Sequence, residues 1–297
     1  MYKLHFGLRE LPFSITPDTS FFFACSNYQE ALNTLLVATK NGEGFIKITG
    51  EVGTGKTLLC RKFMATLDDS FVTAYIPNPY LEPRTLMLAL ADELETPLEK
   101  DFDQYQLLKA INYRLLNLAR EGKRVLLCLD EAQAMPIESL EALRLLTNLE
   151  TEKRKLLQIV LFGQPELDRK LQQDAIRQLT QRITFHYRLG PLTKDDLDFY
   201  LSHRLNVAGF SGRRLFSQGA VRALNAASGG IPRLVNILAH KSLMLTYGEG
   251  KQQVRARHVK AAARDTVAAK QNAWPWMWLG VTTLLIAGTG MGWVYLK

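Results

Sequence analysis

Cysteine is scarce in this chain, and its three cysteines, Cys25, Cys60 and Cys128, lack the spacing of a disulfide framework or a metal site. The opening residues, MYKLHFGLRELPFSIT, contain no apolar core long enough for a secretory leader. No internal repeat and no low-complexity stretch occurs. These absences argue against a disulfide-rich secreted module, a zinc domain and a repeat array. They predict buried free thiols in a reducing compartment.

Acidic residues are rare over one long stretch. Residues 201–270 hold twelve Lys or Arg but only two acids, Glu249 and Asp265, whereas the whole chain has a net charge of +8. The rest of the chain is therefore slightly acidic. A basic region of this kind faces nucleic acid, faces an anionic membrane surface, or only keeps a domain soluble.

Charge is absent altogether from residues 276–296, a run of 21 positions. As a helix this run would be roughly 30 Å long, the thickness of the hydrocarbon core of a bilayer. Aromatic residues, which prefer membrane interfaces, stand at both ends: Trp274, Trp276 and Trp278, then Trp293 and Tyr295. The pattern predicts a transmembrane helix within residues 274–297.

The charges on either side of this span predict its orientation. Residues 251–272 carry six positive charges and one acid, and only Lys297 follows the span. The positive-inside rule then places the N-terminal bulk of the chain in the cytoplasm. Gly288 and Gly292 form a GxxxG pattern that permits close contact between helices, which leaves dimerisation through the span open.

The order of apolar segments predicts an α/β domain followed by an all-helical one. Expected strands alternate with helices through residue 188, and alternation of this kind predicts a parallel sheet. The strands are expected at 45–50, 71–76, 124–129, 156–162 and 183–188, and the helices at 28–42, 56–67, within 83–121 and at 137–149. Thr193 is a candidate cap for the second domain, whose helices are expected near 193–208, 217–228, 232–247 and 255–270. We therefore predict an α/β domain with an N-terminal strap at 1–190, a helical domain at 191–270 and a membrane helix at 274–297.

The stretch GEVGTGKT at residues 50–57 follows an expected strand and opens an expected helix. It matches the phosphate-loop pattern in the structural context that the pattern requires. Glycines let backbone N–H groups close around phosphates, and the helix N-terminus favours negative charge. We predict that Lys56 reaches the β- and γ-phosphates of a nucleotide and that Thr57 ligates Mg²⁺. The predicted nucleotide-binding residues are Gly50, Glu51, Val52, Gly53, Thr54, Gly55, Lys56, Thr57 and Leu58.

The stretch RVLLCLDEAQ supplies carboxylates for the same site. Val125 to Leu129 form a continuous apolar run, typical of a strand buried on both faces. Asp130 then lies at the carboxyl end of that strand, where ligands bind in open α/β sheets. We predict that Asp130 supports Mg²⁺ directly or through water, and that Glu131 polarises the attacking water.

Three further polar residues follow in an order that suggests γ-phosphate sensing. Gln164 comes at the end of an apolar strand, where its amide can hold the attacking water. Arg182 precedes a short strand, and Arg233 follows Pro232 at the first turn of a helix. Taken singly, each is typical of a turn or of the surface.

These motifs, in this order, resemble the AAA+ ATPases, and the more discriminating stretches resemble the ExeA/GspA type of bacterial secretion and pilus systems. Those stretches are the opening HFGLRELPFSITPDTSFFF and, within LLQIVLFGQPEL, the segment FGQPEL. The resemblance implies an AAA+ P-loop fold with a helical lid, ATP and Mg²⁺ as ligands, and a homo-oligomer. It also implies that Gln164 is sensor 1, Arg233 sensor 2 and Arg182 the arginine finger, with Arg177 as a second finger candidate.

The function that we expect is a membrane-anchored ATPase assisting assembly of an MSHA-like type IV pilus or a type II secretion apparatus. Its partners would be inner-membrane assembly proteins, with the basic lid against anionic headgroups. A DNA-associated ATPase, similar to transposition helpers, is the first alternative. The predicted membrane span argues against nucleic acid as a partner. A nucleotide-gated scaffold with little turnover is the second alternative.

Overall fold

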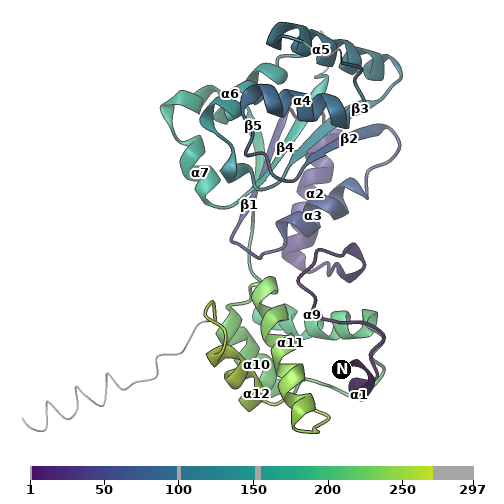
Figure 1. Cartoon of the computed structure of the whole chain (residues 1–297), viewed down its shortest axis with the longest axis vertical. Helices are drawn as coiled ribbons and strands as arrows, with labels where there is room; N and C mark the ends of the chain where they lie inside the picture. The colour runs from purple at the N-terminus through teal and green to yellow at the C-terminus, as the bar shows by residue number, and fades with distance from the viewer. Residues whose placement is uncertain (1, 99–101, 151–154, 270–297) are drawn as a thin grey trace, which may run out of the picture.

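Five parallel strands form the central sheet of the α/β domain (Figure 1). In the computed structural model, which describes residues 2–98, 102–150 and 155–269, their spatial order is β2-β3-β4-β1-β5. The strands are β1 (Phe45–Gly50), β2 (Phe71–Ile76), β3 (Arg124–Leu129), β4 (Leu157–Gly163) and β5 (Ile183–Leu189). All five coincide with predicted strands within one residue at either end. Because the strands are parallel, their carboxyl ends meet at one edge of the sheet.

Helices cover both faces of the sheet and confirm the predicted three-layer α/β architecture. One face packs against α2 (Ser26–Lys40) and α3 (Lys56–Met64). The other packs against α4 (Pro83–Glu93), α5 (Gln104–Arg120), α6 (Ile137–Leu146) and α7 (Glu166–Leu171). Every residue of β4 is buried, which explains why its sequence is apolar at every position except Gln158. The three cysteines are buried free thiols, as predicted.

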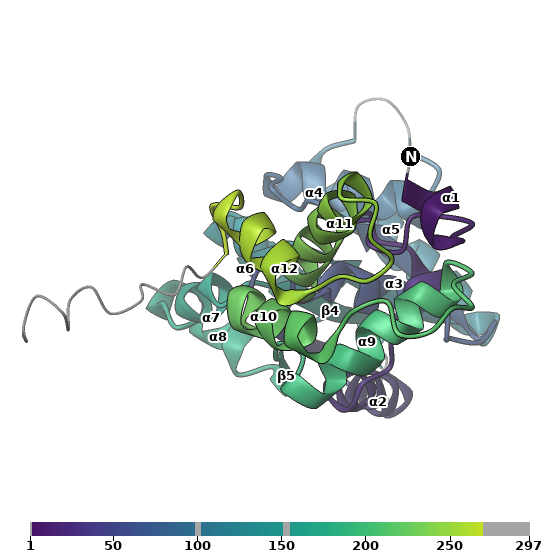
Figure 2. The ribbon, with the colours of Figure 1, turned by 90° about the horizontal axis from the view of Figure 1, so that it is seen from below.

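The second domain is all-helical, as predicted (Figure 2). It consists of α9 (Lys194–Val207), α10 (Gln218–Ser228), α11 (Pro232–Gly248) and α12 (Ala256–Arg264). Thr193 caps α9 as expected, since its side chain accepts from the backbone N–H of Asp196 and the Asp196 carboxylate accepts from the backbone N–H of Thr193. Gly229 ends α10 in the left-handed conformation that suits glycine.

The N-terminal segment, residues 2–25, forms a strap that lies across the helical domain. It opens with α1 (Tyr2–Phe6), and the Tyr2 hydroxyl is 2.8 Å from Nδ1 of His240 on α11. Further along, the backbone N–H of Arg9 donates to the carbonyl of Ala208. The sequence showed no sign of α1, because five residues are too few for a periodic pattern or for a helix that is stable alone.

Arg204 of α9 holds the strap from inside the helical domain. Its side chain is buried, and its guanidinium donates to the carbonyls of Pro12 at 2.5 Å and Ser14 at 3.4 Å. The same group lies over the ring of Phe21, with 4.6 Å to the ring centroid. Asn236 of α11 adds a second donor to the Ser14 carbonyl. The buried cation thus ties the strap to α9 through hydrogen bonds and an aromatic ring, and Asn236 ties it to α11.

The predicted membrane span, residues 276–296, lies outside the described residues. Within the part of the chain that the structure describes, no helix has the length and apolar character needed to cross a bilayer.

We predict that Arg204→Met lowers the free energy of unfolding by about 2 kcal/mol or more, because it leaves buried carbonyls of the strap without their charged donor. Urea unfolding followed by circular dichroism measures the change. Arg222→Met, at an exposed position of α10, is the matched control and should cost less than about 0.5 kcal/mol. Equal losses in the two variants would contradict the role given to Arg204.

Candidate nucleotide site

The loop after β1 has the backbone that a phosphate site requires. Gly53 and Gly55 adopt φ values of +81° and +90°, in the left-handed region that side chains disfavour. A Cβ added at Gly53 would come within 2.7 Å of the Arg233 Cβ, and one at Gly55 within 2.7 Å of the Tyr28 hydroxyl oxygen. Tyr28, from α2, also donates a hydrogen bond to the carbonyl of Thr54. The two glycines therefore permit both the turn and its close packing.

Lys56 lies inside this loop at the first position of α3. Its Nζ donates to the carbonyl oxygens of Gly50 at 2.8 Å and Glu51 at 3.0 Å. Burial lowers the pKa of the Lys56 ammonium, and the nearby carboxylates of Glu131 and Asp130 oppose that shift. The ammonium is thus bonded to neutral oxygens, and a phosphate offers it the negative charge that they lack.

Thr57 and Asp130 meet at the carboxyl edge of the sheet. The Thr57 Oγ1 donates to Asp130 Oδ2 at 2.5 Å, which joins the first turn of α3 to the end of β3. Asp130 is 2% exposed, and burial raises the pKa of its carboxyl while the Thr57 hydrogen bond opposes the change. A hydroxyl and a carboxylate oxygen are hard donors of the kind that Mg²⁺ prefers.

Thr57 and Asp130 supply only part of the ligand set that Mg²⁺ needs, and a bound nucleotide would supply more of it. Among residues 2–98, 102–150 and 155–269, no group of three His, Cys, Asp or Glu is placed to hold a metal. An ion between Thr57 and Asp130 therefore needs further oxygens from phosphates and water, as Mg²⁺ usually does in nucleotide sites.

Glu131 follows Asp130 in a conformation unusual for its type, with φ of 53° and ψ of 36°. Non-glycine residues adopt this region where the surrounding structure holds them, and such positions cluster at functional sites. The Gln164 amide Nε2 donates to Glu131 Oε2 at 2.9 Å, so the structure brings together the predicted water-activating residue and the predicted strand-end amide. A second amide, Gln133 Nε2, donates to the same oxygen at 2.5 Å.

Sequence reasoning missed Gln133. The sequence shows only an amide two residues after Glu131. Its role depends on the backbone N–H of Gln164, which is distant along the chain. An N-terminal strap was predicted as part of the first domain, but its place at the site was not: residues 14–18 line the pocket that opens beside the phosphate loop.

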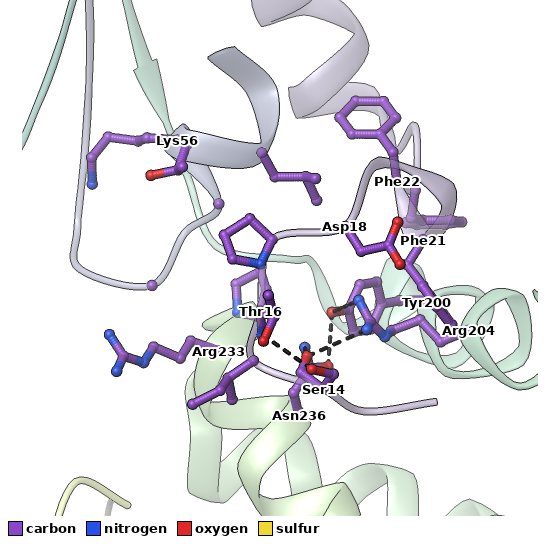
Figure 3. Close-up of a pocket in the computed structure, with 18 of the residues that line it drawn as sticks. Ser14, Thr16, Asp18, Phe21, Phe22, Lys56, Tyr200, Arg204, Arg233 and Asn236 are labelled. Carbon is purple, nitrogen blue, oxygen red and sulfur yellow. Dashed lines mark hydrogen bonds between the residues drawn. The ribbon is translucent and has the colours of Figure 1, made fainter. Parts of the chain in front are cut away.

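Arg233 brings the helical domain onto the loop. Its backbone N–H donates to the Gly53 carbonyl at 3.1 Å, and its side chain is exposed in the pocket. Figure 3 shows Arg233 and Lys56 extending on the same side of the strap. The predicted cationic sensor therefore lies within the same pocket as the predicted phosphate-binding lysine.

Arg182 lies away from this pocket. It precedes β5, whose Ile183 pairs with Phe45 at the start of β1, whereas the phosphate loop follows the end of β1. One strand of this length separates them by roughly 20 Å. The guanidinium donates to Thr147 Oγ1 at 2.9 Å and to the Arg144 carbonyl at 3.4 Å.

Arg177, the second finger candidate, begins α8 (Arg177–Thr180) and is exposed. Its side chain makes no hydrogen bond or ion pair with the described residues. Of the two arginines, Arg177 is thus the one that is free to reach another molecule.

Comparison with known proteins agrees with this geometry. Residues 39–171 match a family described as an AAA domain. General secretion pathway protein A of Aeromonas hydrophila is 40% identical over 299 aligned residues, which cover 99% of this chain and 54% of that protein. The chain therefore spans about half the length of this relative.

Solved structures share the fold at low sequence identity. Cdc6p from Pyrobaculum aerophilum aligns with a TM-score of 0.65 at 19% identity, over 84% of this chain and 71% of that one. The ORC1 protein of Aeropyrum pernix, solved with DNA, aligns with a TM-score of 0.60 at 18% identity, over 86% of this chain and 69% of that one. At these identities the likeness establishes the architecture of sheet and helical domain alone. Residues 39–171 thus form an AAA domain, and the chain is similar over nearly its whole length to general secretion pathway protein A.

Proposed function

We propose that this chain binds ATP with Mg²⁺ and hydrolyses it while anchored in the inner membrane, where it assists assembly of a secretion or pilus apparatus. The observation that carries the enzymatic part is the 2.5 Å contact between Thr57 and Asp130 beside the buried Lys56, with Glu131 held next to them. Phosphate binding, metal support and water activation each have a residue at one edge of one sheet.

Binding begins at the loop. Incoming phosphates offer Lys56 Nζ charged oxygens in place of the carbonyls of Gly50 and Glu51, and the N-terminus of α3 adds a favourable dipole. When bound, Mg²⁺ supplies positive charge that polarises the phosphate oxygens, and Thr57 and Asp130 are the residues that would hold it.

Hydrolysis then requires an oriented water. Glu131 accepts a proton from that water as its oxygen bonds to the γ-phosphorus. The bond from the γ-phosphorus to the β–γ bridging oxygen breaks, and ADP and inorganic phosphate leave. Gln164 and Arg233 stabilise the γ-phosphate oxygens from β4 and from the helical domain, and so report the nucleotide to both domains.

A second copy of the chain completes the site. Arg182 precedes β5, away from the pocket of its own chain, and is bonded to Thr147, whereas Arg177 is exposed nearby. Either would act on a neighbour's nucleotide, Arg182 only after releasing Thr147. Their position supports a homo-oligomer with an arginine supplied in trans.

The proposed membrane location and the proposed apparatus rest on the sequence and on the similarity to general secretion pathway protein A. The uncharged run at 276–296 supports a membrane anchor, and the basic residues of 201–270 support contact with anionic headgroups. The printed name of the relative, general secretion pathway protein A, supports type II secretion, and an MSHA-like type IV pilus is the other apparatus that we propose. Inner-membrane assembly proteins would be the partners.

Both alternatives differ from this proposal in a measurable way. A nucleotide-gated scaffold binds ATP without steady turnover at any protein concentration. A DNA-associated ATPase binds duplex DNA with an affinity that falls steeply with salt.

We predict that Lys56→Ala abolishes nucleotide binding, whereas Glu131→Gln binds ATP and hydrolyses it about 100-fold more slowly or worse. Titration with a fluorescent ATP analogue and a phosphate-release assay measure the two steps. Glu138→Gln, at an exposed position of α6, is the matched control and should behave as wild type. Equal turnover by Glu131→Gln and wild type would remove Glu131 from the mechanism.

We predict that mixing Arg182→Ala with Lys56→Ala chains restores part of the activity that each lacks alone. An arginine acting in trans contributes roughly 10³-fold or more in rate, so a mixed interface stands out clearly. The same mixture with Arg177→Ala decides between the two arginines. Lys56→Ala mixed with Glu131→Gln is the control and should stay inactive, because one chain supplies both residues to one site. If no arginine mixture recovers activity, action in trans is excluded.

We predict that the full chain stays in membranes after a high-salt wash, because a spanning helix is retained by its apolar surface and not by screened charges. Leu285→Arg places a charge near the centre of the predicted span, at a cost of roughly 3 kcal/mol, and should increase the fraction released. Leu285→Ala is the matched control. Release of the wild-type chain by salt alone would show peripheral binding.

A further inference from the structure

Gln133 links the Asp130–Glu131 segment to the end of β4. It lies in the short 3-10 turn Ala132–Ala134, directly after those two carboxylates. Its side-chain Nε2 donates to Glu131 Oε2 at 2.5 Å, and its Oε1 accepts from the backbone N–H of Gln164 at 2.9 Å. One amide thus joins the water-activating carboxylate to the neighbouring strand.

We propose that Gln133 is a positioning residue that keeps Glu131 in its catalytic orientation when Gln164 turns to the γ-phosphate. The inference rests on the proposed ATP hydrolysis.

The orientation of the Gln133 amide follows from its partners. A backbone N–H only donates, so the atom facing Gln164 must be the amide oxygen. The nitrogen then faces Glu131, whose ionised carboxylate only accepts. Both ends of the amide are therefore assigned by chemistry, and flipping it would break both hydrogen bonds.

Gln133 and Gln164 differ in how firmly they are held. The Gln133 side chain is fixed at both ends, and Lys170 Nζ holds its turn by donating to the carbonyls of Gln133 at 2.7 Å and Met135 at 2.6 Å. Among the residues that the structure describes, the Gln164 side chain makes one hydrogen bond, from its Nε2 to Glu131. Gln164 can therefore leave Glu131 at the loss of one bond, whereas Gln133 cannot move without losing two.

This difference has a chemical consequence for the carboxylate. Both amides donate to the same oxygen, Oε2 of Glu131. The other oxygen, Oε1, is thereby left to accept the proton of the attacking water. When Gln164 turns away, the bond from Gln133 preserves that orientation. A misplaced catalytic group costs up to roughly 100-fold in rate for a displacement of about 1 Å.

The test compares two substitutions at position 133 in the full chain. Gln133→Met keeps the length of the side chain and removes both hydrogen bonds. Gln133→Ala also removes both hydrogen bonds and adds no charge beside Glu131, and it serves as the deciding variant if Gln133→Met does not fold. We expect each to lower kcat roughly 10- to 100-fold, with KM and the Kd for ATP within about twofold of wild type.

A structural control and a double variant separate positioning from folding. Ser139 lies on α6, and its hydroxyl donates to the carbonyl of Leu81, away from Glu131. Ser139→Ala removes this hydrogen bond and should lower the melting temperature while leaving kcat unchanged. In single-turnover assays, Gln133→Met should slow the Glu131→Gln enzyme by less than about twofold, because Gln133 acts through Glu131.

The outcomes are distinct. A kcat within threefold of wild type in the folded variants, a rise in KM at constant kcat, or losses that multiply in the double variant would each overturn the role of Gln133. Wild-type chain without turnover would overturn the proposed hydrolysis itself, and this inference with it.

Discussion

The hydrogen bond from Thr57 Oγ1 to Asp130 Oδ2 joins the phosphate loop and α3 to the carboxylates that follow β3. The strand order places β4 between β1 and β3, so the ends of β1 and β3 lie about 10 Å apart. The phosphate loop crosses that gap, because α3 packs over both β1 and β4 and presents Thr57 in its first turn. The pairing of a hydroxyl with a buried carboxylate therefore depends on the parallel sheet, on the glycine-rich turn and on the start of α3 together.

The same loop also carries the contact between the domains. Gly53 accepts a hydrogen bond from the backbone N–H of Arg233, and the absence of a Cβ at Gly53 lets the start of α11 lie directly on the loop. One apolar core runs from the α2–α3 face of the sheet through the strap into the helical domain. The loop and the start of α11 are therefore coupled by direct contact. The residues that lead toward the predicted membrane span follow that domain.

The parts that the sequence predicted are those with local or periodic signals. The strands β1 to β4 appeared as largely apolar runs and β5 as a short strand after Arg182, and the glycines, Lys56 and Thr57 appeared as a motif whose spacing the phosphate geometry imposes. The roles of Gln133, Tyr28 and Arg204 were invisible. Each depends on a partner that is distant along the chain or on a conformation such as the positive φ of Glu131. For Arg182 the sequence predicted a role but not the surroundings. A lone arginine before a strand gives no sign of the hydrogen bond that Arg182 donates to Thr147.

The central claim is that this edge of the sheet holds Mg²⁺ and ATP for hydrolysis. A crystal structure of the full chain carrying Glu131→Gln, grown with Mg²⁺ and ATP, tests it most directly. The account predicts the triphosphate in the loop, Lys56 Nζ moved from its two carbonyls to the phosphates, and an ion with Thr57 Oγ1 as a ligand and Asp130 beside it. It also predicts the side chain of Arg233 directed at the γ-phosphate. A nucleotide bound elsewhere, or a loop that keeps Lys56 on Gly50 and Glu51 at saturating ATP, would contradict the account.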